Sequence, residues 1–137
     1  MRDRRGSARG AGPHVFEIRF DDPRLVGRRA TLVFTERADG RPDGTVFQAV
    51  VVQVGRGRDQ ALMIVRLEEP LRMGATSALR EGKEFDWLAL HRRGSGWFPR
   101  VAQLLFRQVQ VNVFDGMNVR PGELPLPLGI ATLTWRR

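Results

Sequence analysis

The chain has 137 residues, 42% hydrophobic and 28% charged, which suits one folded domain and is not typical of a disordered protein. The absence of cysteine excludes disulfides, thiolate metal ligands and a cysteine nucleophile. The formal net charge is +8, and every basic residue except Lys83 is an arginine. An arginine excess favours an anionic partner, although the codon usage of a GC-rich genome would produce the same excess.

The first twelve residues are rich in Arg, Gly, Ala and Ser and show no apolar periodicity, so we expect residues 1–12 to form a disordered arm. No apolar stretch follows the arginines, as it would in a secretory signal, and no run approaches the roughly 20 apolar residues that cross a bilayer. We therefore expect a cytoplasmic protein without membrane contact, whose residues 13–137 form a single β-rich domain.

Alternation of apolar and polar residues predicts seven strands, beginning with Phe16, Ile18 and Phe20 on one face. The strongest pattern lies at 45–54, where consecutive valines are apolar on both faces. We expect Pro70 to end the fourth strand, because proline cannot donate to a ladder. The predicted strands are 14–20, 29–36, 45–54, 60–68, 84–91, 109–114 and 128–135.

Between the fifth and sixth predicted strands the period changes. Apolar residues in 98–107 follow helical spacing and predict one short amphipathic helix, with an extended strand as the alternative. The segment 70–83 lacks a clear period and could include a short helical turn near 76–81. Regular turn signals and the lack of βαβ alternation predict an all-β fold, a small antiparallel barrel or sandwich of about seven strands with one short helix. The expected core is Phe16, Ile18, Phe20, Leu32, Phe34, Val50, Val52, Met63, Val65, Trp87, Leu104, Val111, Val113 and Leu133.

Candidates for catalysis are few. His14 and His91 are the only imidazoles, there is no tyrosine, and no serine lies in a nucleophile elbow. We therefore predict no catalytic residues, no metal site and no cofactor, and lean against enzymatic activity, although a barrel cavity could gather residues that are scattered in the sequence.

Two glycine turns carry arginines that could bind an anion. Gly55–Asp59 contains Arg56 and Arg58, and Arg92 and Arg93 precede the turn 94–96. Neither stretch matches a P-loop or a dinucleotide fingerprint, so tight hairpins with solvated arginines are the competing interpretation. Two tryptophans near basic residues could stack on bases. The candidate anion and nucleic-acid contacts are Arg4, Arg5, Arg9, Arg56, Arg58, Arg92, Arg93, Trp97, Trp135, Arg136 and Arg137.

The pair Arg5 and Arg9 ahead of a predicted barrel resembles the Arg-x-x-x-Arg arm of PilZ domains, a family that binds cyclic dinucleotides. That family also carries an Asp/Asn-x-Ser-x-x-Gly strand motif. The nearest stretch here, 59–64, has neither the Ser nor the Gly. The resemblance is therefore confined to the arm, and the chain is not assigned to the family.

Two functions remain. The first is a non-catalytic structural or interaction module, a subunit or adaptor in a larger assembly that contacts a protein partner or another copy of itself. Strands that are apolar on both faces would leave apolar surface exposed on the outside of the fold, and such patches commonly mark interfaces. The Pro-rich segment 115–127 could serve as an arm that docks on a partner. The alternative is binding of a polyanion or nucleic acid through the arginine-rich termini.

Overall fold

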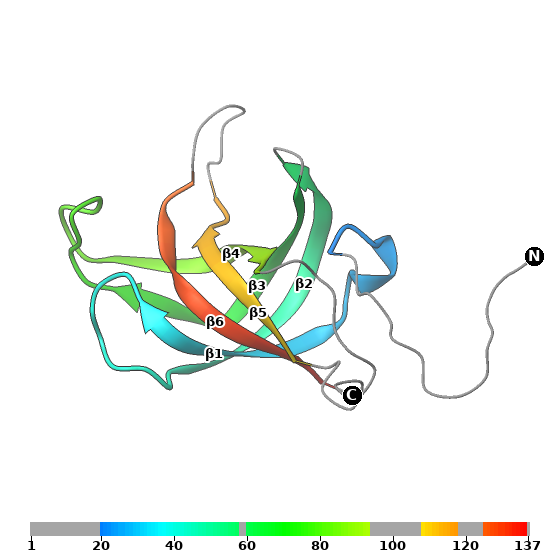
Figure 1. Ribbon diagram of the computed structural model, residues 1–137, viewed down its shortest axis with the longest axis horizontal. Coiled ribbons are helices and arrows are strands. Elements are labelled where there is room, and N and C mark those ends of the chain that lie inside the picture. Colours follow the sequence, from blue (N-terminus) through cyan, green and yellow to red (C-terminus); the bar gives the residue numbers. More distant parts are fainter. Residues whose placement is uncertain (1–19, 58–59, 94–107, 118–124, 137) are drawn as a thin grey trace, which may run out of the picture.

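The computed structural model describes residues 20–57, 60–93, 108–117 and 125–136. They form a closed barrel of six strands, shown in Figure 1, which confirms the all-β prediction with one strand fewer than expected. Most of the first predicted strand (14–19), the predicted helix 98–107 and the arm 1–12 lie outside the described residues. The strands are β1 (Arg29–Arg37), β2 (Val46–Gly57), β3 (Gln60–Met73), β4 (Lys83–Arg92), β5 (Gln108–Asp115) and β6 (Pro127–Trp135).

Every strand runs antiparallel to the strands before and after it in sequence. The barrel closes where β6 pairs with β1, with Leu32 opposite Leu133 and Ala30 opposite Trp135. In this simple up-and-down order each strand pairs with its neighbours in sequence, as consecutive strands usually do, although only the β2–β3 connection is short.

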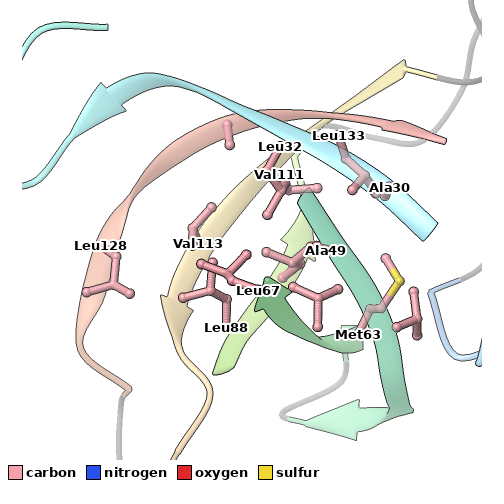
Figure 2. Close-up of a cluster of buried hydrophobic side chains, with 14 of the residues drawn as sticks. Ala30, Leu32, Ala49, Met63, Leu67, Leu88, Val111, Val113, Leu128 and Leu133 are labelled. Atoms are coloured by element: carbon pink, nitrogen blue, oxygen red, sulfur yellow. The ribbon is translucent and has the colours of Figure 1, made fainter. Parts of the chain in front are cut away.

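The barrel interior is filled by side chains from all six strands. On β1, Ala30, Leu32 and Phe34 alternate inward, as the period of two requires. Figure 2 shows Ala30 and Leu32 in one cluster with Met63, Leu88, Val111 and other apolar side chains, and Phe34 belongs to the same buried core. Burying each large side chain contributes about 1.5–3 kcal/mol, so this packed interior is the main source of stability.

Two strands bury other residues than the alternation predicted. On β2 the inward residues are Ala49 and Val51, whereas Val50 and Val52 are only partly buried. Because Val50, Val51 and Val52 are all apolar, alternation alone cannot predict which of them face the interior. The register with β3 also shifts between Val51 and Gln53. On β4, Leu88 and Leu90 are fully buried, and Trp87 is partly exposed.

The prediction that Pro70 ends its strand is wrong, because β3 continues to Met73. The pairing with β4 jumps from Arg66 opposite Trp87 to Leu71 opposite Phe85, so Pro70 lies in an irregularity that requires no ladder bond.

The segment near 76–81 is not helical. Instead Thr76 and Leu79 exchange backbone N–H···O bonds of 2.8 and 3.3 Å. Within the described ranges the helical element is the 3-10 turn η1 (Pro23–Leu25), whose first turn Asp22 caps by accepting a bond from the Arg24 N–H. No helix in the described part of the chain is long and apolar enough to span a membrane.

Candidate anion-binding end of the barrel

The antiparallel order brings arginines that are distant in sequence to one end of the barrel. β1 begins at the end where β2, β4 and β6 finish, towards the right of Figure 1. We call this the basic end and define it as residues 20–29, 55–57, 91–93 and 134–136. The end opposite it, the acidic end, comprises residues 36–46, 67–87, 114–117 and 125–128.

Charge is divided unevenly between the two ends. The described residues of the basic end include seven arginines and two carboxylates, whereas those of the acidic end include nine carboxylates and five basic residues. The basic-end arginines are Arg24, Arg28, Arg29, Arg56, Arg92, Arg93 and Arg136. The barrel body therefore has a positive end and a negative end, although its overall excess is small.

Three arginines lie together where β1 meets β6. The backbone N–H of Arg136 donates to the carbonyl of Arg29 at 2.9 Å, so the two residues are held side by side. The Arg28 guanidinium stacks over the Trp135 ring at 5.4 Å from its centre. The Nη1 of Arg136 donates to Oε1 of Gln48 at 3.0 Å, a neutral partner that leaves the positive charge in place.

Both carboxylates of the basic end are already paired with arginines. Asp22 holds Arg24 at 2.7 Å, and Asp21 holds Arg56 at 3.1 Å. Among the residues that the structure describes, no carboxylate pairs with Arg28, Arg29, Arg93 or Arg136. These four exposed side chains are the basic-end charges that a ligand could neutralise.

The sequence interpretation of Trp135 as a stacking residue is corrected by its position. Trp135 lies on β6 in the same inward series as Ala131 and Leu133, and only 5% of it is exposed. Arg28 also covers its ring. A nucleic-acid base therefore has no open face of this indole to stack on.

The structure brings some of the anion-contact residues predicted from the sequence to one end of the barrel, and others lie outside the described residues. It brings Arg56, Arg92, Arg93 and Arg136 to the same end, and it adds Arg28 and Arg29, which the sequence analysis missed. The signal was present in the sequence, since the pair Arg28 and Arg29 stands at the start of β1, as Arg92 and Arg93 stand at the end of β4. The candidates outside the described residues are Arg4, Arg5, Arg9, Arg58, Trp97 and Arg137.

The acidic end contains a buried ion pair. Nη2 of Arg37 lies 3.2 Å from Oδ2 of Asp39, and the side chains are 3% and 1% exposed. Arg37 also donates to the carbonyl of Arg72 at 2.6 Å, and Asp39 accepts from the N–H groups of Gly74 and Arg41 at 2.9 and 3.1 Å. These bonds fasten the turn after β1 to the end of β3.

Opposing effects act on the Asp39 carboxyl. Burial tends to raise the pKa of Asp39, but the Gly74 and Arg41 N–H bonds and the charges of Arg37 and Arg41 lower it overall. The group is therefore ionised in the folded protein, and we assign it a structural role because its oxygens are occupied by protein donors.

The described residues offer little to catalysis or metal binding. They contain no group of three or more His, Cys, Asp or Glu residues placed to hold a metal ion. The His91 ring packs edge-on against Phe114 with centres 5.3 Å apart, and burial lowers the pKa of His91. A neutral imidazole packed in this way suits an apolar contact.

The comparisons with known proteins assign the chain to no group: no family model matches it, and neither the curated proteins nor the solved structures contain a match.

Proposed function

We propose that this protein is a non-catalytic module that binds a polyanion at the basic end of its barrel. The observation that carries the proposal is the position of Arg28, Arg29, Arg93 and Arg136 at one end, without a described carboxylate partner. A cytoplasmic location, expected from the sequence, is part of the proposal.

The chemistry of the basic end favours phosphate or sulfate groups. Each guanidinium offers a planar fork of donors that matches such an anion, and several forks held on one rigid fold bind a repeating anion more strongly than a single ion. Binding to a charged polymer also releases its condensed counterions, so affinity falls as salt rises. The acidic end repels the same ligand and thereby orients its approach.

The test compares two triple variants that change the net charge equally. The basic-end variant carries Arg29→Glu, Arg93→Glu and Arg136→Glu, and the control carries Arg66→Glu, Arg72→Glu and Arg80→Glu. All six side chains are exposed. Binding to heparin and to labelled DNA is measured by elution salt and fluorescence anisotropy, with circular dichroism as the check of folding.

We expect the basic-end variant to lose binding and the control to keep most of it. If three phosphate contacts are lost, the slope of log affinity against log salt becomes shallower by about 2–3. Equal loss in both variants would show that net charge alone matters, and a wild-type chain that binds neither heparin nor DNA at low salt would refute the proposal.

An interaction module is the second candidate, and the outer barrel surface favours it. Ile64, Ala89 and Phe114 lie opposite one another on β3, β4 and β5; Ile64 and Phe114 are partly exposed, whereas Ala89 is buried. Together with the exposed Val26, Val46 and Met117, Ile64 and Phe114 supply apolar surface for contact with a protein partner or another copy of the chain. Light scattering tests self-association: a monomer at every concentration, unchanged by Ile64→Lys, would count against it.

A further inference from the structure

We propose that the ligand of the basic end is the phosphate backbone of a nucleic-acid duplex, bound without reading the base sequence. This inference rests on the proposed function, since it names which polyanion the same arginines bind. Three features of the described residues carry it: the burial of the aromatic rings, the rigidity of the arginine positions and the scarcity of base-reading side chains on the β2–β3 ribbon.

The basic end offers no stacking platform within the described residues. Single-strand binders gain much of their affinity from exposed aromatic rings on which bases stack. Here Phe20 and Trp135 are 1% and 5% exposed, and the partly buried His91 is in edge contact with Phe114. Unstacked bases therefore find no exposed aromatic ring among the described residues of the basic end, where the favourable contacts are those to phosphates.

The arginines are attached to backbone that the barrel holds in place. Arg29 belongs to β1 and faces Val50, while the Arg136 N–H is bonded to the Arg29 carbonyl. The Arg93 N–H donates to the carbonyl of Gln110 at 2.9 Å. A fixed array of this kind suits the stiff, regular phosphates of a duplex, whereas a flexible single strand loses conformational freedom when it is held.

The element best placed to enter a groove has little with which to read bases. A two-stranded ribbon fits the major groove, and β2 and β3 form such a ribbon where Gly55, Arg56 and Gly57 pair with residues 60–62. Two of these three β2 residues are glycines without side chains, and Arg56 is ion-paired with Asp21 at 3.1 Å. Among the described residues of the ribbon, Gln60 is the remaining residue of a base-reading type, so we expect little discrimination between base sequences.

The experiment measures anisotropy of the full chain with four labelled probes under identical low-salt conditions. The probes are two duplexes of unrelated sequence, one single strand of the same length, and inorganic polyphosphate of matched charge. We expect the duplexes to bind alike within about twofold, and at least about tenfold more tightly than the single strand, a difference of about 1.4 kcal/mol. The basic-end triple variant should lose this preference.

Each other outcome has a defined meaning. Equal or tighter binding of the single strand overturns the inference but leaves the proposed function standing, and loss of that binding in Trp97→Leu would assign it to stacking outside the described residues. If polyphosphate binds as tightly as the duplexes, the inference is also overturned, because the regular arrangement of phosphates along a duplex would then contribute nothing to affinity. A strong difference between the two duplex sequences refutes the claim that bases are not read. Failure of every probe to bind refutes the proposed function itself.

Discussion

At the scale of single residues, the least expected feature is the buried pair of Arg37 and Asp39. In the sequence, nothing in an Arg-x-Asp pattern distinguishes a buried pair from a solvated one. The partners that make burial tolerable, Gly74 and the Arg72 carbonyl, lie about 35 positions away in sequence. Only the folded barrel brings them together.

Removing one partner of this pair is predicted to be costly. Asp39→Ala leaves the Arg37 guanidinium buried beside the unpaired N–H of Gly74, and we expect a loss of about 3–5 kcal/mol in the free energy of unfolding. Urea titration measures it. Glu84→Ala is the control, because it breaks the exposed Arg72–Glu84 pair and should cost less than about 1 kcal/mol. Similar losses in both variants would contradict the structural role of Asp39.

The stability of the protein is predicted to fall between neutral and mildly acidic pH because of His91. Burial lowers the pKa of His91 in the folded state, so the His91 imidazole of the unfolded chain takes up a proton at a higher pH, about 6.5, than that of the folded chain. Above about pH 6.5 this proton has no effect on stability. As the pH falls from there towards the folded pKa, the free energy of unfolding decreases. In His91→Gln, the difference between urea midpoints at pH about 7 and about 5.5 should shrink.

An unchanged difference in His91→Gln would assign the pH dependence to other groups. Asp39 is not a competing explanation in this range. The folded pKa of Asp39 lies below the ordinary aspartate value of about 3.9, so its contribution to stability is lost only at more acidic pH.

At the scale of secondary structure, the sequence predicts where strands lie better than which face they bury. Six of the predicted strands correspond to β1 through β6, because turn residues separate clear alternating runs. The wrong assignments, Val50, Val52 and Trp87 as core and Pro70 as a terminus, occur near register shifts. Such a shift inserts residues into one strand only, so it is defined by the pairing partner and leaves little mark on the strand's own pattern.

Gly129 in β6 is predicted to be important for the stability of the barrel. Gly129 has φ +147°, and a Cβ there would meet the carbonyl oxygen of Glu36 on β1. We expect Gly129→Ala to lower the free energy of unfolding by about 2–4 kcal/mol, because both the backbone conformation and the contact disfavour a side chain. Gly55→Ala is the matched strand control, since a Cβ there meets nothing within 4 Å. Equal denaturation midpoints for the two variants would contradict the prediction.

At the scale of the whole molecule, the sequence identified arginine clusters but not their assembly into one end. Treating the termini as the main site followed from the small net charge of the body. That sum conceals the separation of charge, because acidic residues near the opposite strand ends cancel it. Antiparallel order is what converts arginines at the start of one strand and the end of the next into neighbours.

The relative roles of the arm and the barrel are open to a direct measurement. Deleting residues 1–12 removes Arg2, Arg4, Arg5 and Arg9, and we expect DNA affinity to fall while binding remains detectable. The salt dependence should become shallower, because fewer phosphates are neutralised. Complete loss of binding would place the site on the arm and leave the basic end of the barrel without a role.

Closure of the barrel has a consequence for how the chain meets other chains. Each of the six described strands pairs with a strand on either side, so none of them is an edge strand of the sheet. The described barrel therefore has no free edge strand for a foreign strand to extend, which favours partners that recognise side chains rather than backbone. The same closure guards against fibril growth: the molecule must first break one of its six ladders, such as β1 with β6, before it can template another copy.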